Sequence, residues 1–92
     1  MEVYEEDKVR LSSLIEGEHA TILGISTECR GANRRRLLDL GFTKGTLLNL
    51  EYMGPNQNPR AYRLRNTLIA LRNDQADLIL IEKTQYDRTG SL

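Results

Sequence analysis

Three consecutive arginines, Arg34, Arg35 and Arg36, are the residues of this chain best suited to binding another molecule. A guanidinium pairs with carboxylate or phosphate groups through two parallel hydrogen bonds and keeps its charge when it loses water. The arginines therefore suit an acidic protein surface, the anionic inner leaflet of a membrane or a nucleic acid. The simplest alternative is the solvated side of a short helix, since most runs of charge are only that.

The arginines belong to a segment with the residue spacing of an amphipathic helix that ends at Leu40. At about 100° per residue, Leu37 and Leu40 fall on one face together with Asn33, and we expect that face to be buried. Leu38 falls on the flank of the helix beside Arg34, so we expect it to remain accessible. The segment therefore predicts a short helix with an apolar side and a basic side.

A glycine and an aromatic residue mark the end of this helix. Gly41 suits the left-handed backbone conformation that commonly follows the last turn, because it has no Cβ. Phe42 then occupies the position whose side chain packs back on the helix, here on Leu37. We expect the helix to stop at this point and the chain to turn through residues 43–46.

The basic side of the helix and the following turn form a candidate docking surface for another macromolecule. Leu38 would supply an apolar contact ringed by charge, an arrangement typical of the residues that dominate binding energy at interfaces. Asp39 opposes the helix dipole in the last turn, and Arg35 would offset that cost by only a few tenths of a kcal/mol. The predicted partner-binding residues are Arg34, Arg35, Arg36, Leu38, Asp39 and Lys44.

Length and composition predict one soluble domain without membrane insertion. The chain has 92 residues, and no apolar run approaches the roughly 20 residues that cross a bilayer. Its acidic start is unlike a signal peptide, so we expect a cytoplasmic protein. The net charge is zero, yet residues 30–72 contain nine basic residues against two acidic ones. This uneven distribution favours one basic face on the folded protein.

Five segments have the alternation or the short apolar run of β-strands, and turn-forming residues separate them. They are residues 19–26, 47–53, 60–65, 68–72 and 77–83, with a single helical turn at residues 73–76. A small sheet protects its edges best by curling, so we expect a mainly β fold, a partly open barrel of about five strands with one inserted α-helix. The expected core comprises Ile22, Leu37, Leu50, Ile69 and Ile79, with Tyr52 and Tyr62 also facing inward.

The two ends of the chain are predicted to lie outside the folded domain. Residues 1–8 are mostly acidic and residues 84–92 mostly polar, so neither has enough apolar side chains to pack. We expect a flexible acidic N-terminal arm at 1–8, the domain at 9–83 and a flexible C-terminal tail at 84–92.

Over residues 11–81 the chain resembles the FeoA family of ferrous iron transport accessory proteins. The two most specific parts of the resemblance are the run from Arg35 through Phe42 with Gly45, and the pair Leu71 and Arg72 followed by Ala76 and Ile79. The chain has Asn58 and Pro59 where the family often has Asp-Pro. It also has residues 65–67 where the family often has a glycine, a role that Asn66 suits because it tolerates the left-handed region.

The resemblance implies an SH3-like barrel that is not an enzyme and uses no cofactor. FeoA proteins accompany FeoB, a membrane ferrous transporter with a cytosolic GTPase domain. The resemblance therefore implies an accessory or regulatory module that docks on the cytosolic part of such a transporter. We expect it at the inner face of the membrane through that partner, as a monomer or with weak self-association.

Two other functions stay open from the sequence alone. A stand-alone SH3-like domain with a basic face could bind nucleic acid, although the zero net charge and an aromatic content of 5% disfavour this. It could also be a regulatory domain that responds to a transition metal. Glu16, Glu18 and His19 are weak candidates for a loose surface metal site, but the lone histidine leads us to predict no metal site. Cys29, the single cysteine, is expected to be a structural thiol.

Overall fold

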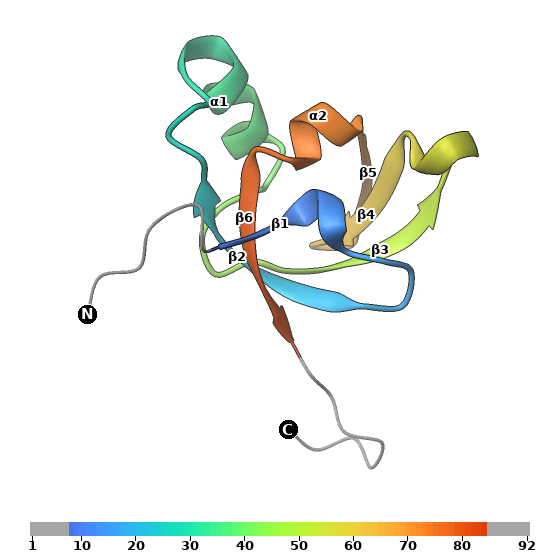
Figure 1. Ribbon diagram of the computed structural model, residues 1–92. Helices are drawn as coiled ribbons and strands as arrows, with labels where there is room; N and C mark the ends of the chain where they lie inside the picture. Colours follow the sequence, from blue (N-terminus) through green and yellow to red (C-terminus); the bar gives the residue numbers. More distant parts are fainter. Residues whose placement is uncertain (1–7, 85–92) are drawn as a thin grey trace.

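The structure, a computed structural model, describes residues 8–84 as one antiparallel sheet of six strands with two helices (Figure 1). The strand order is β1-β6-β2-β3-β4-β5. The strands are β1 (Val9–Arg10), β2 (His19–Ile25), β3 (Leu47–Met53), β4 (Arg60–Leu64), β5 (Thr67–Leu71) and β6 (Ile79–Thr84). The helices are α1 (Gly31–Asp39) and α2 (Asn73–Ala76), with short 3-10 turns η2 (Leu11–Ser13) and η3 (Pro55–Gln57). Residues 1–7 and 85–92, most of the predicted arm and tail, lie outside the described residues.

The mainly β class, the inserted helix and the helical turn are confirmed, but the sheet has six strands where the sequence predicted about five. The additional strand is β1, which consists of two residues. Val9 lies opposite Ile81 and Arg10 opposite Leu80 in β6. A strand this short has no alternating pattern to detect, because its position comes entirely from pairing with a distant segment.

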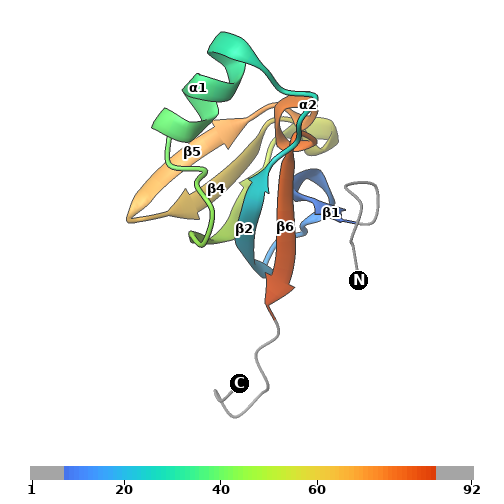
Figure 2. The ribbon, with the colours of Figure 1, turned by 90° about the vertical axis from the view of Figure 1, so that its left-hand side faces the viewer.

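Two bulges curl the sheet into its partly open barrel. The register shifts between Ile22 and Gly24 where β2 pairs with β6, and between Leu50 and Tyr52 where β3 pairs with β4. A bulge bends a strand and increases its twist. The curled sheet carries α1 and α2 at the same end, which both views of the molecule show (Figures 1 and 2).

The core lies inside the curl and largely matches the expected one. Ile22, Leu50 and Ile79 are fully buried, and Leu37 joins them from α1. Ile69 packs against this cluster but is only partly buried, because β5 is the last strand of the sheet. The segment around η2 contributes two fully buried leucines that the sequence analysis did not place, Leu11 and Leu14.

The prediction that Tyr52 faces the core is wrong, since its side chain is 52% exposed. The pairs Leu50–Tyr62 and Tyr52–Ala61 are adjacent in the ladder, so β3 has one extra residue, Glu51, between them. An extra residue reverses which face the following side chains point to. Tyr62, in contrast, is fully buried as predicted.

Helix α1 ends as the sequence predicted. The N–H of Phe42 donates to the carbonyl oxygen of Leu37 at 3.1 Å, and the N–H of Gly41 donates to that of Leu38 at 3.0 Å. These two bonds define the Schellman ending, and Gly41 has the required positive φ of 112°. Phe42 and Leu37 are both buried in the core cluster, so the end of α1 is fixed by packing as well as by hydrogen bonds.

Candidate functional site

The three consecutive arginines have different surroundings in the structure. Arg34 is half-buried, and its Nη1 donates hydrogen bonds of 3.3 Å to the carbonyl oxygens of Ile25 and Ser26. These acceptors lie at the end of β2, so Arg34 ties α1 to the sheet. It was predicted as a partner-binding residue, and the structure gives its guanidinium a partner within the chain.

Arg35, Arg36 and Lys44 are exposed, and none of their side chains makes a hydrogen bond or ion pair with any residue in 8–84. Leu38 lies on the same helix with 37% of its surface exposed. We call these four residues the basic face. It combines unengaged positive charge with an apolar side chain, which is the composition expected of a protein docking surface.

Asp39 is exposed at the end of α1, as expected. Within the described part of the chain it forms no ion pair with Arg35. The carboxylate is therefore available to a partner, but it lowers the local positive charge.

Arg65 joins the basic face through the turn that follows α1. Its Nη2 donates to the hydroxyl oxygens of Thr43 and Thr46, at 3.2 and 3.0 Å, and those two hydroxyls lie 3.0 Å apart. Arg65 comes from the β4–β5 turn, so its place beside Lys44 depends on tertiary structure. Sequence reasoning missed it, because nothing local links residue 65 to the turn at 43–46.

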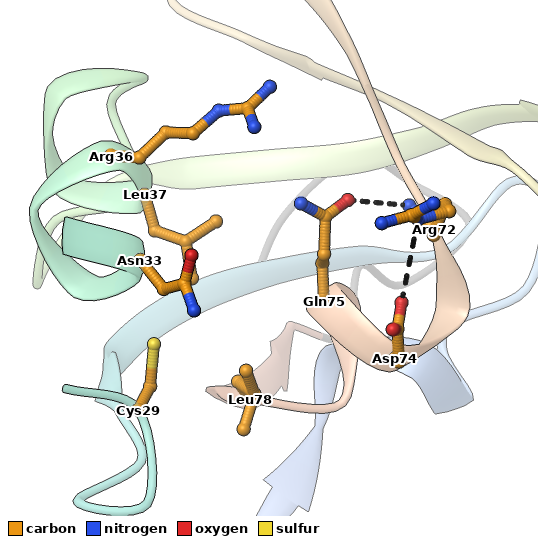
Figure 3. A pocket seen from close by; sticks show the side chains of 8 residues that line it. All are labelled: Cys29, Asn33, Arg36, Leu37, Arg72, Asp74, Gln75 and Leu78. Atoms are coloured by element: carbon orange, nitrogen blue, oxygen red, sulfur yellow. Dashed lines mark hydrogen bonds and ion pairs between the residues drawn. The ribbon is translucent and has the colours of Figure 1, made fainter. Parts of the chain in front are cut away.

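A pocket of about 170 Å³ opens between α1 and α2 (Figure 3). In Figure 3, Arg36 extends from α1 over Leu37 toward Gln75 on the opposite side. The pocket is lined by Cys29, Asn33, Arg36, Leu37, Arg72, Asp74, Gln75 and Leu78. Its volume suits a single side chain of a partner rather than a small organic ligand.

The floor of the pocket is apolar and its rim is polar. Leu37 and Cys29 are buried at 3% and 4% exposure. On the rim, the N–H of Arg72 donates to Oε1 of Gln75 at 3.0 Å, while the Arg72 guanidinium reaches Asp74 only at 3.9 Å. Arg36 has no such partner among the described residues. The pocket therefore fits an aliphatic side chain with a carboxylate close to it.

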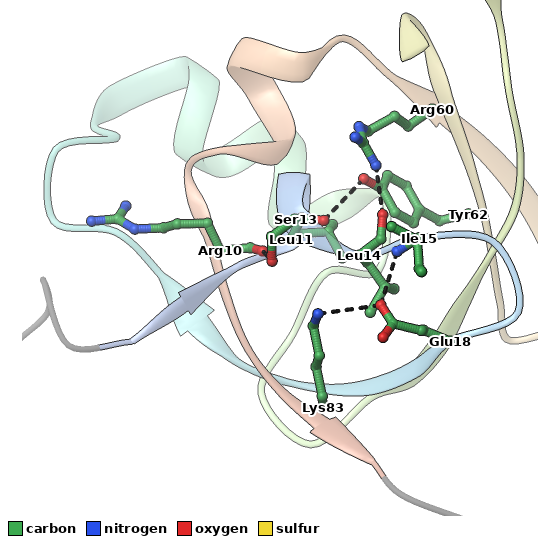
Figure 4. Close-up of polar contacts among 9 residues, drawn as sticks. All are labelled: Arg10, Leu11, Ser13, Leu14, Ile15, Glu18, Arg60, Tyr62 and Lys83. Atoms are coloured by element: carbon green, nitrogen blue, oxygen red, sulfur yellow. Dashed lines mark hydrogen bonds and ion pairs between the residues drawn. The ribbon is translucent and has the colours of Figure 1, made fainter.

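The weak metal candidates are occupied by contacts of their own. Glu16 Oε2 accepts a hydrogen bond from the Met53 N–H at 3.3 Å. Glu18 Oε1 accepts one from the Ile15 N–H at 2.9 Å and lies 3.2 Å from Lys83 Nζ (Figure 4). These interactions, the Ile15 hydrogen bond above all, lower the pKa of Glu18. Within residues 8–84 no three His, Cys, Asp or Glu side chains gather to hold a metal ion.

A buried arginine, Arg60, makes polar contacts inside the barrel (Figure 4). Arg60 is 5% exposed, and its guanidinium donates to the Leu14 carbonyl oxygen at 2.7 Å and to Asn73 Oδ1 at 2.9 Å. Tyr62 donates its hydroxyl to the Leu11 carbonyl oxygen at 3.3 Å. Together they join β4 to η2 and α2, and so hold α2 in place beside the pocket.

A sequence model of the FeoA domain matches residues 9–83. The chain belongs to the FeoA family. The six-stranded fold with its α1 insertion is thus the FeoA domain, and its neighbours among solved structures include FeoA proteins, one of them described as an SH3 domain protein.

Among curated proteins, the chain is similar to the Fe(2+) transport protein A/Fe(2+) transporter FeoB fusion protein of Porphyromonas gingivalis. The two are 32% identical over 83 residues, which span 90% of this chain but 10% of the fusion protein. This FeoA domain therefore corresponds to a small part of that relative.

Two solved FeoA structures are similar over most of their length. The FeoA-like protein of Clostridium acetobutylicum has a TM-score of 0.77 and 28% identity, with 88% of this chain and 92% of that chain covered. FeoA of Stenotrophomonas maltophilia, solved in complex with zinc, has a TM-score of 0.71 and 28% identity, with coverages of 80% and 89%.

Proposed function

We propose that this protein is a non-enzymatic accessory module of ferrous iron uptake that docks on the cytosolic part of a FeoB-type transporter. One observation carries the proposal: a relative that joins Fe(2+) transport protein A to the transporter FeoB in a single chain. Fusion keeps two domains at a high effective concentration, which is useful when the separate domains act on one another. In this proposal the protein is cytoplasmic and reaches the inner face of the membrane through its partner.

The basic face and the pocket beside it are the proposed contact region. Arg35, Arg36 and Lys44 have no partner within the described chain, so docking costs no internal ion pair. Leu38 and the apolar floor of the pocket supply surface whose burial favours binding. The complementary partner surface is acidic and presents at least one aliphatic side chain to the pocket.

The charges and the apolar groups have different roles in such a complex. Exposed charges mainly speed association and make it sensitive to salt. A central apolar contact excluded from water mainly slows dissociation. We therefore expect salt to reduce the association rate, and truncation of Leu38 to raise the dissociation rate.

The test is binding of the labelled full chain to the purified full-length transporter in each nucleotide state. The double variant Arg35→Gln/Arg36→Gln should weaken binding about tenfold or more, since each charged interface residue contributes on the order of 1 kcal/mol. Arg63→Gln/Lys83→Gln is the control, because it also removes two exposed cations, each ion-paired within the chain, from outside the contact region. Absence of binding by the parent chain in every nucleotide state would contradict the proposal.

Nucleic-acid binding is the alternative function, and the exposed Tyr52 is the observation in its favour. An exposed aromatic side chain can stack on a base, and Arg63 lies on the neighbouring strand of the same face. Tight, salt-sensitive binding of an oligonucleotide that Tyr52→Ala abolishes would support this alternative. Unchanged weak binding in that variant would leave transporter docking as the better explanation.

A further inference from the structure

Strand β5 is the last strand of the sheet and has β4 as its one neighbour in the strand order (Figure 2). Natural edge strands are usually protected by a charge, a proline, a bulge or a covering segment. The sequence of β5 is TLIAL, which has neither a charged residue nor a proline, and its pairing with β4 is regular throughout. Within residues 8–84, no backbone hydrogen bond reaches β5 from any segment other than β4. The edge is therefore able to pair with another strand.

The turn between β4 and β5 determines which backbone groups point outward. Arg65 and Asn66 have φ values of 52° and 63°, the signature of a two-residue type I′ hairpin turn. In such a hairpin the flanking residues, here Leu64 and Thr67, form a hydrogen-bonded pair, and bonded pairs alternate from there. Thr67, Ile69 and Leu71 therefore bond to β4. The N–H and C=O groups of Leu68 and Ala70 point away from the sheet.

We propose that β5 is a self-association surface, at which two copies of this chain pair antiparallel about a twofold axis through Ile69. In this register Leu68 of each copy lies opposite Ala70 of the other, and each such pair exchanges both of its hydrogen bonds. The groups left free by β4 are then all satisfied, and the two sheets become one. The proposal goes beyond docking on a transporter and does not depend on it.

The side chains on the outer face fit this register. Leu68 and Ala70 point to the same face as Ala61, which lies between Ala70 and Tyr52 in the ladder. On this face Leu68 is 40% exposed and Tyr52 is 52% exposed. Ala70 and Ala61 occupy the ladder positions between these two large side chains. In the dimer, Leu68 of the second copy lies beside Ala70, whose small side chain is exposed, whereas Ala61 on the neighbouring strand is already covered at 1% exposure. A large side chain opposite a small one makes the strand complementary to itself.

The charges beside β5 do not oppose this pairing. With the axis at Ile69, Arg72 of one copy lies opposite Asn66 of the second copy, so no two arginines face one another. The uncharged edge favours a second copy over a charged partner strand, because pairing leaves no buried charge uncompensated. The interface is small, so we expect a dissociation constant of about 10–100 µM.

Sedimentation of the full chain from about 10 µM to about 1 mM tests the proposal. We expect a monomer–dimer equilibrium that Leu68→Lys weakens at least about tenfold through charge repulsion across the edge. Leu47→Lys is the matched control, because Leu47 is also exposed, at 48%, but lies on β3. Ala70→Pro removes an outward N–H without removing a bond to β4, so it should weaken the dimer while the domain stays folded.

Amide hydrogen exchange gives an independent readout that a folding defect would not mimic. In the parent chain, exchange at Leu68 and Ala70 should slow as concentration rises, whereas Ile69 should be protected at every concentration. The proposal is overturned if the chain remains a monomer throughout this range. It is also overturned if a dimer forms that neither Leu68→Lys nor Ala70→Pro weakens, or if the edge is protected only by a strand of another protein.

Discussion

Arg34 donates a hydrogen bond from Nη1 to the carbonyl oxygen of Ile25 at 3.3 Å, and this contact anchors α1 to the end of β2. Its neighbour Arg35 is exposed and makes no such contact within the described chain. Adjacent residues of one charged run thus serve the fold in one case and remain available for binding in the other.

We expect Arg34→Gln and Arg35→Gln to differ in stability. Loss of the Arg34 contacts should lower the free energy of unfolding by about 1 kcal/mol, because two carbonyl oxygens lose a charged donor. Arg35→Gln, a surface change, should alter it by less than about 0.5 kcal/mol. Urea unfolding of the two variants measures this difference, and equal effects would contradict the assignment.

Arg60 should be more important for stability than any exposed arginine. Its guanidinium is buried and bonded to the Leu14 carbonyl oxygen and to Asn73. Arg60→Gln should therefore lower the free energy of unfolding by about 2–3 kcal/mol, because buried acceptors lose their donor. Arg63→Gln, on the exposed face of the same strand, serves as the control and should cost less than about 1 kcal/mol. Similar urea unfolding midpoints for the two variants would argue against a stabilising role of the Arg60 hydrogen bonds.

Substitutions at Gly41 should follow an order set by the backbone rather than by size alone. With φ at 112°, any Cβ is strained, although it would make only an ordinary van der Waals contact with Leu64 Cδ1 at 3.5 Å. We expect Gly41→Asn to lower the free energy of unfolding less than Gly41→Ala does, and Gly41→Val to lower it most. The losses should range over about 1–3 kcal/mol. Thermal unfolding of the three variants gives the order. A valine variant as stable as the asparagine variant would refute the role of the left-handed conformation.

Tyr62 should make the protein sensitive to alkali. Burial raises the pKa of Tyr62 from its ordinary value of 10.0 to about 12. Between these two values the phenol ionises in the unfolded chain but not in the folded one, so stability falls as pH rises through this window. Unfolding at a series of pH values measures the slope. The stability of Tyr62→Phe should depend less steeply on pH between pH 10 and pH 12 than that of the parent. An unchanged slope would contradict this explanation.

Glu18 should contribute to the acid sensitivity of the protein. The Ile15 N–H and Lys83 lower the pKa of Glu18 below its ordinary value of 4.5 in the folded state. Its contribution to stability is present above that value and is lost as pH falls through the lowered pKa. Glu18→Gln should thus be less stable than the parent near neutral pH, and the two should converge in acid. A constant difference at every pH would exclude the carboxylate charge as the cause.

Local residue patterns were sufficient to predict the main elements of this fold. The spacing of Leu37 and Leu40, followed by Gly41, located α1 and its end, because helix periodicity and capping depend on neighbouring residues. The strands were located by alternation for the same reason. Helix α1 begins at Gly31, however, earlier than the pattern around Asn33 indicated, since helix starts are weakly marked without a capping side chain.

The sequence predicted the candidate site only as a set of residues. It indicated that Arg34, Arg35 and Arg36 lie on the outer side of a helix. The distance from Arg34 to the end of β2, and the closing of a pocket by α2, depend on segments that the chain brings together only on folding. Whether Arg34, Arg35 and Arg36 bind a partner stays a prediction, as it does for Leu38, Asp39 and Lys44.

The sequence by itself determined the family, the order of the helices and of every strand except β1, and the way α1 ends, because these are marked by local residue patterns. Tertiary structure decided the pairing of β1, the exposure of Tyr52 after the bulge, the burial of Arg60 and the position of β5 as the last strand of the sheet. These depend on which distant backbone groups find hydrogen-bond partners and which side chains lose contact with water. Neither this backbone pairing nor this burial of side chains exists until the sheet has curled.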